Sequence, residues 1–446
     1  MVDKSALMSV IEFLTSKAKR RLASDLLDVY FRDAKCLNDF DAIGAAAMET
    51  KYTSMYLRCA EICYGLARTN QEIVLARENL INAYNFTNQP EKALLYIDLQ
   101  QQAKPDDFDT QCLKIASLSL MGKRAECEEL VQRLFANNPH EKENKEFLLS
   151  SIYLRQGRTA KGLMHWLNNF KPKHKIFNDM LKFHHWTGGA YPGRTIISVG
   201  EGGIGDELIN LRFFDYLRDL GMNPILYATW DEYRSDVTEL IRRHGYQVEK
   251  NYLFFPKDSL WCYHMNIPAH LGLNESQLWR QPYLFAQRNP KNKLNETGLK
   301  IGIKVQGNPY FEQDHYRSIP IDQMLAALPE NANIYYIDKA QSYQGCIDLS
   351  NRIQTWEDTL DFIDQMDIIV SSCTSLPHVA GAMGKTTIVL TPILEYYIWT
   401  STRKDTSSVW YGSNFFNFKQ TSIGSWIEPL QQVKNFFLSG EYQKWI

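Results

Sequence analysis

The sequence predicts an all-α helical-repeat domain at the N-terminus, followed by an α/β core made of two lobes. Residues 1 to about 170 show helix-length apolar periodicity and almost no strand pattern. After Pro172, short apolar strands alternate with helix-length stretches, which is typical of a parallel α/β fold. A polar gap at residues 288–296 divides this alternation into two series, so two doubly wound units are expected.

Length and composition are those of a folded protein with several domains. The chain has 446 residues, of which 44% are hydrophobic and 22% charged. The length predicts about two to four domains. The formal net charge of −2 gives no global basic field that would attract nucleic acid. Two local basic clusters are interpreted as a solvated helix face and a linker: Lys17, Lys19, Arg20 and Arg21, and Lys171, Lys173, His174 and Lys175.

The N-terminal region and the cysteines favour a cytoplasmic protein. Asp3, Lys4 and Glu12 interrupt the first residues, so we do not expect a signal peptide. No apolar run approaches the roughly 20 residues that a membrane span requires. The eight cysteines are scattered without a CxxC pair, which is the pattern of reduced, buried thiols rather than of a zinc site.

Three segments of the N-terminal region share one register. They begin at Gln89, Gly122 and Gly157, and each runs toward a proline. The closing prolines, spaced by 34 and then 33 residues, are Pro105, Pro139 and Pro172. The small residues at the matching position, spaced by 34 and then 35, are Ala93, Cys127 and Gly162.

This period resembles that of the tetratricopeptide repeat, in which two helices cross at a small residue and a proline closes the second helix. One helix pair cannot bury its apolar face alone, so neighbouring pairs must stack into a solenoid. Residues 1–70 are expected to be helical too, as a divergent repeat or a cap.

The α/β core is predicted from strands and helices that alternate between turn-rich segments. In the first series, strands are expected at 195–199 and 224–229, and helices at 207–220 and 235–244. In the second series, strands are expected at 300–305, 333–337, 368–371 and 387–390. A last amphipathic helix is predicted at 426–438. Two such units in tandem define a cleft, where a ligand is expected.

A glycine-rich turn after the first predicted strand has two interpretations. Gly200, Gly202 and Gly205 match the GxGxxG fingerprint, and Asp231 follows the next strand, which is the basis of an alternative, an NAD-dependent oxidoreductase. However, Asp206 would place a carboxylate at the helix N-terminus that has to receive the pyrophosphate. At the mouth of a cleft this carboxylate suits a general base, and its structural alternative is a plain helix cap.

Four motifs, in order, resemble the lipopolysaccharide-heptosyltransferase-like family. The first contains Trp186, Glu201-Gly-Gly-Ile-Gly-Asp-Glu and Arg212. The second is Ile301-Gly-Ile-Lys-Val-Gln-Gly-Asn-Pro with Tyr316-Arg-Ser-Ile-Pro, and the third is Thr355-Trp-Glu-Asp-Thr-Leu-Asp-Phe-Ile. The fourth is Ser371-Ser-Cys-Thr-Ser-Leu-Pro-His-Val-Ala-Gly-Ala-Met-Gly. The resemblance covers about residues 186–400, and animal O-linked N-acetylglucosamine transferase is more remotely similar.

The resemblance implies a GT-B glycosyltransferase core. Residues 1–170 would be the repeat domain, 171–290 a Rossmann-like lobe on the acceptor side, and 291–446 a Rossmann-like lobe on the donor side whose last helix packs back on the first lobe. The family's proposed base, which activates the acceptor hydroxyl, matches Asp206. The same acceptor-side loop contains Gly203, Gly205 and Arg212.

The fourth motif has the features of a diphosphate site. Thr374, Ser375 and the backbone N–H groups that follow begin a helix after a strand, which favours anions, and His378 lies one turn on. The resemblance adds the donor-site candidates Arg317, Lys304, Gln306 and Thr359. Arg317 would neutralise the leaving diphosphate, which is needed when no metal does so. Taken alone, His378 reads as a satisfied helix histidine, Arg317 as a surface residue and Thr359 as a helix-start residue.

One position departs from the family pattern. The family usually has an aspartate before the threonine of the fourth motif, and this chain has Cys373. A thiol does not replace a charged acceptor, so the heptose-specific expectation weakens. This departure supports the alternative that the core is an inactive scaffold.

A metal-dependent transferase is not expected. Asp39-Phe-Asp41 and Asp107-Phe-Asp109 match the short Asp-x-Asp pattern, but both lie at predicted helix boundaries, where aspartates act as caps. GT-B enzymes generally need no bound metal, and the sequence shows no ligand cluster. We therefore expect no cofactor and a nucleotide-diphosphate sugar as co-substrate. The aromatic-rich segment 392–411 is interpreted as core, with stacking on a base or sugar as the alternative.

The sequence thus predicts an inverting, metal-independent glycosyltransferase. The donor is expected on the second lobe, at the helix start that contains Thr374, while Asp206 deprotonates the acceptor hydroxyl. Three acceptor classes stay open: a protein or peptide along the repeats, a saccharide, or a modified DNA base. The oligomeric state also stays open. The inactive scaffold and the oxidoreductase are the competing functions.

Overall fold

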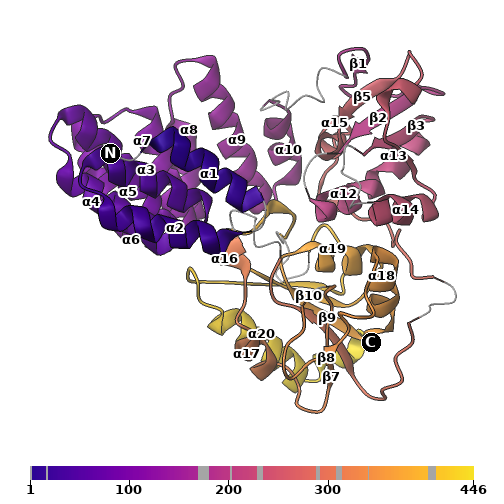
Figure 1. The fold of residues 1–446 in the computed structure, drawn as a ribbon. Coiled ribbons are helices and arrows are strands. Elements are labelled where there is room, and N and C mark those ends of the chain that lie inside the picture. The colour runs from indigo at the N-terminus through magenta and orange to yellow at the C-terminus, as the bar shows by residue number, and fades with distance from the viewer. Residues whose placement is uncertain are drawn as a thin grey trace. The chain divides into compact units, whose positions relative to one another are not determined.

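The computed structural model describes residues 3–16, 19–168, 180–200, 203–228, 235–287, 292–307, 314–339, 341–399 and 408–446 (Figure 1). The chain forms two compact units, Met1–Glu141 and Lys142–Ile446. The domain limits predicted at 170/171 and 290/291 lie outside the described residues and stay predictions. The basic cluster at 171–175 and Lys17 lie outside them as well.

The first unit is helical throughout the part that the structure describes. Its helices are α1 (Lys4–Ser16), α2 (Arg20–Asp33), α3 (Leu37–Glu49), α4 (Thr53–Leu66), α5 (Asn70–Phe86), α6 (Pro90–Ala103), α7 (Phe108–Leu120) and α8 (Arg124–Arg133). Each helix from α3 to α8 packs on the next along the chain. The predicted helical N-terminal region is confirmed.

The predicted repeat register appears as helix pairs. Helix α9 (Pro139–Arg155) begins in the first unit and lies mostly in the second, and α10 (Thr159–Asn168) follows it there. Among the small residues, Ala93 and Cys127 are buried, and a Cβ on Gly162 would lie 2.9 Å from the Leu154 backbone nitrogen. Close helix crossing therefore requires a small residue at this position. The assignment to tetratricopeptide repeats stays a prediction.

Two details of the helical region concern single residues. Pro139 opens α9 instead of closing the preceding helix, which ends at Arg133, because proline has no N–H and suits a first helical position. The carboxylate of Asp39 accepts from the Lys35 and Cys36 amides at 3.0 and 3.2 Å. Asp107 accepts from the Thr110 amide at 2.9 Å. The capping role predicted for the two Asp-x-Asp pairs is thus seen at Asp39 and Asp107.

The second unit contains two parallel sheets, which confirms the predicted pair of Rossmann-like lobes. The first sheet has the order β1-β5-β2-β3-β4. Its strands are β1 (His184–His185), β2 (Thr195–Val199), β3 (Asn223–Tyr227), β4 (Gln247–Glu249) and β5 (Leu260–Tyr263). Its helices include α12 (Ile204–Asn210), α13 (Phe214–Asp219), α14 (Ser235–Arg243) and α15 (Ile267–His270). The helix predicted at 207–220 is interrupted by a 3-10 turn at Leu211–Phe213.

The second sheet has the order β11-β10-β9-β6-β7-β8. Its strands are β6 (Lys300–Lys304), β7 (Asn333–Tyr336), β8 (Ile347–Asp348), β9 (Ile368–Ser372), β10 (Thr387–Thr391) and β11 (Phe415–Lys419). Its helices are α16 (Asp314–Arg317), α17 (Ile321–Ala326), α18 (Trp356–Gln365), α19 (Ser375–Ala382) and α20 (Ile427–Leu438). The central strands are buried on both faces, because Ile301 and Ile368 face one apolar cluster and Ile369 the other.

The strand orders fix where a ligand can enter. The chain runs from β2 to β3 and later returns to β5 on the other side of β2. In the second sheet it runs from β6 to β7 and later returns to β9 beside β6. In such sheets, the crevice beyond the carboxyl ends of the strands at the reversal receives the ligand. Helix α12, which follows β2, packs against α19, which follows β9 (Figure 1).

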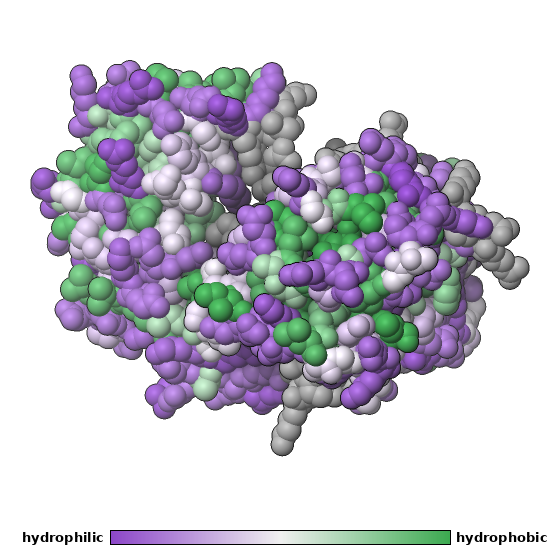
Figure 2. Space-filling model, turned by 90° about the horizontal axis from the view of Figure 1, so that it is seen from below, coloured by the Kyte–Doolittle hydropathy of each residue, from purple (hydrophilic) through white to green (hydrophobic). Residues whose placement is uncertain are grey.

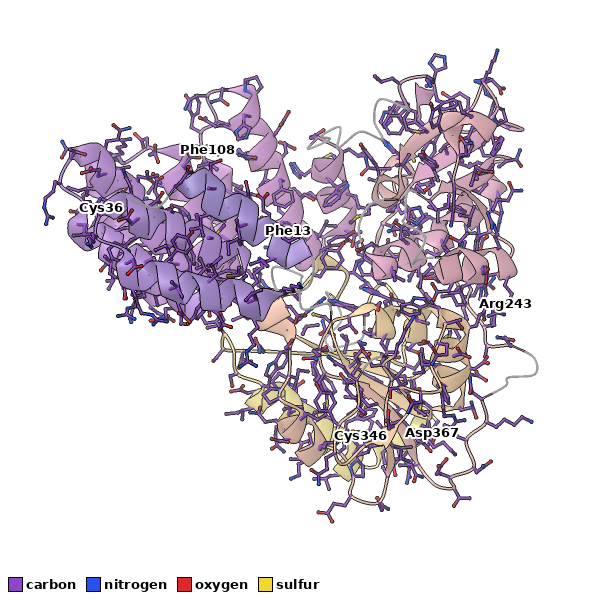
Figure 3. The ribbon with its side chains drawn as sticks, in the orientation of Figure 1. Phe13, Cys36, Phe108, Arg243, Cys346 and Asp367 are labelled. Carbon is purple, nitrogen blue, oxygen red and sulfur yellow. The ribbon has the colours of Figure 1, made fainter. Side chains whose placement is uncertain are left out.

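A second contact between the lobes lies at α14 and α18. Arg243, labelled in Figure 3, ends α14, and its Nε donates to the Glu357 Oε1 of α18 at 2.6 Å. Because this pair is partly exposed, its contribution to stability is small, about 1 kcal/mol or less. The two lobes therefore meet both at the ligand crevice and away from it.

The last helix packs differently from its prediction. The sequence predicted that it returns to the first lobe, but the buried side chains of α20 lie against the second sheet. Val433 and Phe436 join Phe416 and Phe418 of β11 in one cluster, and the Phe416 and Phe436 ring centroids are 5.1 Å apart. Strand β11, which the sequence did not reveal, provides the surface that the helix covers.

The surface of the chain is mixed in character. Figure 2 shows hydrophilic residues spread over the face seen from below, with hydrophobic patches between them. Of the helices that the structure describes, none has the length and apolar character needed to cross a bilayer.

A buried histidine, hydrogen bonded to a side chain of β2, makes the free energy of unfolding depend on pH. Ser198 Oγ donates to His264 Nδ1 at 2.5 Å, and His264 Nε2 donates to the Glu207 carbonyl at 2.9 Å. Burial lowers the pKa of His264 from its ordinary 6.5 to about 4. Below about pH 6.5 the unfolded chain therefore takes up a proton that the folded protein excludes, and stability falls as the pH drops toward 4.

We expect this one histidine to lower the unfolding free energy by about 2 kcal/mol between pH 7 and pH 5. Denaturant unfolding at pH 7, 6 and 5 measures the loss. Burial lowers the pKa of His270 to about 4 as well, so it adds to the same slope. A stability that is flat over this pH range would contradict the prediction.

Candidate active site

A cavity of about 490 Å³ lies where the carboxyl ends of β6 and β9 approach the turn after β2. Its volume is within the usual range for ligand sites. The sequence-predicted site residues that line it are Gly203, Gly205, Asp206, Lys304, Arg317, Thr374, Ser375 and His378. These residues come from both sheets, so the fold brings together candidates that lie up to 175 positions apart in the chain.

The carboxylate of Asp206 is held at the first turn of α12. Its Oδ2 accepts from the Gly203 amide at 2.8 Å, and its Oδ1 accepts from the Tyr396 hydroxyl at 2.9 Å. Burial raises the pKa of Asp206, while both hydrogen bonds and the charge of Arg317 oppose this shift. Asp206 is thus a cap and, at the same time, a half-buried carboxylate on the cavity wall. The cap interpretation is seen in the structure, and the role of Asp206 as a general base stays a prediction.

The two lobes approach closely at Gly205. A Cβ at this position would lie 2.9 Å from His378 Cδ2 and 3.4 Å from Ser375 Cα. Glycine therefore lets α12 pack directly on α19. The cause is a helix contact rather than a positive φ, and it explains why a glycine precedes Asp206.

His378 is a buried, neutral side chain on the cavity wall. Its Nδ1 lies 2.6 Å from the Tyr411 hydroxyl, and its ring stacks on Trp399 with centroids 4.1 Å apart. Burial, with the positive charge of Arg212, lowers the pKa of His378 well below its ordinary value. A neutral imidazole interacts with an anion as a hydrogen-bond donor and not as a cation.

The start of α19 supplies a backbone donor to the cavity. Thr374 is the N-cap, and its hydroxyl accepts from the Leu376 amide at 3.4 Å. Ser375 lines the cavity, Pro377 has no N–H and the Leu376 amide donates to Thr374, so the first-turn amide that faces a ligand is that of Ser375. With the helix dipole, this amide favours a negatively charged ligand.

Arg317 adds a positive charge beside this helix start. Its Nη1 donates to the Cys373 carbonyl at 3.0 Å, and its Nε donates to Asp314 Oδ1 at 2.9 Å. A Cβ on Gly307 would lie 2.2 Å from Arg317 Nη2, so this glycine makes room for the guanidinium. Arg317 is therefore a cavity residue fixed on the end of β9, and not a free surface arginine.

A second cavity of about 310 Å³ adjoins the first. Ile204, Lys304 and Ser375 line both cavities. The Lys304 ammonium pairs with Asp338, which lies just after β7 and lines the second cavity. Thr359 lines it as well, and its hydroxyl donates to the Thr355 carbonyl at 3.3 Å. The two cavities together form an elongated site along the ends of β6, β7 and β9.

Two predicted residues do not line these cavities. The Gln306 side-chain amide donates to Gln341 Oε1 at 2.6 Å. Arg212 is buried, and its guanidinium donates to the Ile209 carbonyl at 2.8 Å, to the Trp410 carbonyl and to the Tyr283 hydroxyl. It also lies 4.7 Å from the centre of the Tyr411 ring. In this structure Arg212 holds the lobes together, because its partners come from both of them.

Cys373 lines the larger cavity as a neutral thiol. Burial raises its pKa to about 12, although the nearby Arg317 opposes the shift. The cavity therefore lacks the negative charge that an aspartate would place here. This wall of the cavity is therefore less repulsive toward a phosphate group than it would be with an aspartate at position 373.

Sequence reasoning missed Tyr396 and Tyr316. Tyr396 follows β10 and contacts Asp206 from the other lobe, 190 positions away in the chain. Tyr316 lines the cavity on α16, and burial raises its pKa to about 12. Tyr316 belongs to the second sequence motif, so that motif could have identified it as a site residue. The hydrogen bond of Tyr396 has no counterpart in any local pattern.

The dinucleotide fingerprint is only partly visible. Gly202 and Asp231 lie outside the described residues. At the part that is described, the Gly203 amide is hydrogen bonded to Asp206, and Gly205 packs on His378. Among the described His, Cys, Asp and Glu side chains, no group of three or more lies close enough together to hold a metal ion.

Fold and site together define a two-lobe α/β protein with Rossmann-like parallel sheets and a polar cavity at their strand reversals. No protein-family model matches the chain, and no curated protein matches its sequence.

Three solved structures show remote similarity. The iron-containing dodecameric glycosyltransferase TibC from enterotoxigenic E. coli has 12% identity and a TM-score of 0.36, over 49% of this chain and 64% of that one, which is less than two thirds of its length. The heptosyltransferase TibC in complex with ADP-D-β-D-heptose has 12% identity and a TM-score of 0.37, over 57% and 78%. A mutant O-GlcNAc transferase from Thermobaculum terrenum has 11% identity and a TM-score of 0.33, over 92% of both chains. At such low similarity, the function has to be derived from this chain's own residues.

Proposed function

We propose that this chain is a GT-B-type glycosyltransferase that moves a sugar from a nucleotide-diphosphate sugar to an acceptor hydroxyl. One observation carries the proposal. The carboxylate of Asp206, from the first lobe, and the anion-binding start of α19, from the second, line the same cavity. A base and a diphosphate site in one cavity are the two groups that such a transfer requires.

The diphosphate binds at the start of α19. The Ser375 amide lies at the positive end of the helix dipole, and Arg317 donates to the carbonyl of Cys373 beside this helix start. Arginine presents several N–H donors in a plane, which suits phosphate oxygens. Neutral His378 donates one further hydrogen bond. These groups take the place that a metal ion has in other transferases.

The nucleoside occupies the second cavity. Ile337, Ile353 and Trp356 line it with apolar surface that suits a base. Asp338 lies at the end of β7, where a carboxylate accepts hydrogen bonds from ribose hydroxyls. Lys304 lines both cavities and lies between nucleoside and diphosphate.

The chemical step is a single displacement at the anomeric carbon. Asp206 accepts the proton of the acceptor hydroxyl as its oxygen attacks that carbon. The bond from the carbon to the diphosphate oxygen breaks on the opposite face, and the stereochemistry inverts. The negative charge that develops on the leaving oxygen is stabilised by the Ser375 amide at the start of α19 and by Arg317. The raised pKa of Asp206 makes it a stronger base than an exposed aspartate.

The acceptor is a protein or peptide, a saccharide, or a modified nucleic-acid base. The cavity that Asp206 lines also includes Tyr396, Leu394 and Pro392. Their apolar surface can pack against an acceptor of any of these three classes. The inactive scaffold and the oxidoreductase are tested in the same experiment as the transferase.

A thermal-shift screen over nucleoside diphosphates, their sugars and NAD tests the proposal, because a specific ligand stabilises the folded state by mass action. We expect stabilisation by one nucleotide family and slow hydrolysis of the corresponding nucleotide sugar. Stabilisation without hydrolysis or transfer would favour the scaffold. Stabilisation by NAD alone would overturn the transferase.

Arg317→Met should weaken binding of the nucleoside diphosphate by about tenfold to a hundredfold, since a charge-assisted contact to phosphate contributes about 1.5–3 kcal/mol. Calorimetric titration measures the dissociation constant. Arg280→Met is the matched control, because Arg280 lies on the surface and pairs with Asp219 at 2.7 Å. Equal affinity in both variants would place the diphosphate elsewhere.

A further inference from the structure

Helices α9 and α10 pack on the segment that carries Tyr396. Trp166 of α10 donates from Nε1 to Asn266 Oδ1 at 2.7 Å, and its ring centroid lies 6.0 Å from that of Tyr397. Leu154 and Leu163 are buried in a small cluster against which Tyr397 packs. The helix pair is therefore attached to the residue that directly follows Tyr396.

The residue that precedes Tyr396 is held from two sides. The Nε of Arg155, at the end of α9, donates to the Glu395 carbonyl at 2.8 Å. The Glu395 side chain is buried, and its carboxylate pairs with Lys419 at the end of β11. A buried charge pair fixes this residue strongly, because separating it would leave a charge without a partner. The hydrogen bond from Arg155 holds the backbone carbonyl of Glu395, whereas the ion pair with Lys419 holds its side chain.

Tyr396 itself donates to Asp206 Oδ1 at 2.9 Å. An unbroken chain of contacts thus runs from α9 through the Glu395 carbonyl to the Tyr396 hydroxyl and the carboxylate. We infer that Arg155 is a positioning residue, which holds the Tyr396 hydroxyl on Asp206 and so fixes the carboxylate that faces the acceptor. The inference deepens the proposed function and rests on it, because Asp206 matters as a base only if the chain is a transferase.

If Arg155 positions Tyr396, loss of Arg155 should shift the pH dependence of kcat/KM. The titratable and charged side chains that line the cavity with Asp206 are Tyr396, Tyr316, Cys373, Arg317, Lys304 and His378. Of these, Tyr396 and Arg317 oppose the rise in the Asp206 pKa. A loosened Tyr396 therefore raises the pKa of Asp206 further, and the acidic limb of kcat/KM moves to higher pH. A merely structural loss would lower activity equally at every pH.

The test compares Arg155→Met with Arg158→Met, both assayed in the full chain with the donor found in the thermal-shift screen. Arg158 is an exposed arginine close to Arg155 in the chain; its guanidinium lies 4.4 Å from the centre of the Tyr153 ring and donates to Gln156 Oε1 at 3.1 Å. On the acidic limb, Tyr396→Phe should lower kcat/KM by about tenfold and Arg155→Met by about threefold. Arg158→Met should follow the wild type.

A double-mutant cycle makes the test sharper. If Arg155 acts through Tyr396, adding Arg155→Met to Tyr396→Phe should cause little further shift of the limb. Full additivity, or the same profile for Arg155→Met and Arg158→Met, would overturn the inference. Arg155→Lys, which keeps a cationic donor, should restore part of the wild-type profile.

A measurement that does not depend on enzyme turnover distinguishes this inference from the proposed function. Hydrogen exchange of the backbone amides of residues 393–399, measured by mass spectrometry, should be faster in Arg155→Met than in Arg158→Met. Equal exchange in the two variants would overturn the attachment of this segment to α9. Absence of turnover in the wild type with every donor would instead overturn the transferase, whatever the exchange shows.

Discussion

Asp206→Asn is expected to lower kcat for sugar transfer by about a thousandfold, because general base catalysis contributes about 10²–10⁴ in rate. The amide is nearly the same size as the carboxylate, and its oxygen can still accept from the Gly203 amide, which Asp206 Oδ2 does at 2.8 Å. Donor affinity should therefore change by about twofold or less. Initial rates at saturating donor and acceptor, together with calorimetric donor binding, measure the two quantities separately.

Asp215→Asn is the control for the loss of one carboxylate in the same lobe. Asp215 pairs with Arg218 on α13 at 2.9 Å and lies at the surface, so its replacement should leave both rate and affinity unchanged. Full turnover by Asp206→Asn with normal donor binding would remove the base from the mechanism. Loss of donor binding in that variant would show instead that the carboxylate supports the donor side.

Gly205→Ala is expected to destabilise the two-sheet unit by about 1–3 kcal/mol and to weaken donor binding by about tenfold. The added methyl group would lie 2.9 Å from His378 Cδ2. The imidazole cannot easily yield, because it stacks on Trp399 and is hydrogen bonded to Tyr411. Helices α12 and α19 must then separate, which moves the base away from the helix start that holds the diphosphate. Thermal unfolding and donor titration measure both effects.

Gly65→Ala is the matched control, because a Cβ there meets nothing within 4 Å. This residue lies in α4, so alanine should be neutral or stabilise the helix by up to about 1 kcal/mol. Gly205→Ala should cost less stability in a His378→Ala background than in the wild type, since the second change removes the ring that the methyl group meets. Normal stability and affinity in Gly205→Ala alone would show that the contact tolerates a larger separation.

Most of the longer buried strands could be read from the sequence almost to the residue, with β5 and β11 as exceptions. The strand predicted at 195–199 is β2, and that predicted at 300–305 is β6, one residue shorter. A central parallel strand is buried on both faces, so it appears as an uninterrupted apolar run. Strands β1, β4 and β8 were not predicted, because they have two or three residues and exist only through pairing with a neighbour.

The site was predictable where its chemistry is local. Thr374 and Ser375 form a helix start that is visible in the sequence, and both line the cavity. Arg212 stood close to Asp206 in the chain, but its side chain turns into the contact between the lobes. Tyr396 reaches Asp206 across 190 positions, and such a contact depends on how two sheets meet rather than on any spacing.

The attachment of α9 and α10 to the two-sheet unit bears on how the protein can be shortened. A version that begins after residue 170 would keep every strand, yet it would lack Arg155 and Trp166. It would also expose Tyr397 and Ala269, because Leu154 and Leu163, which pack against them, are removed with the two helices. A version that begins just before Pro139 keeps these contacts, so it is the better starting point for crystals, for display of the two lobes, or for grafting a different helical arm.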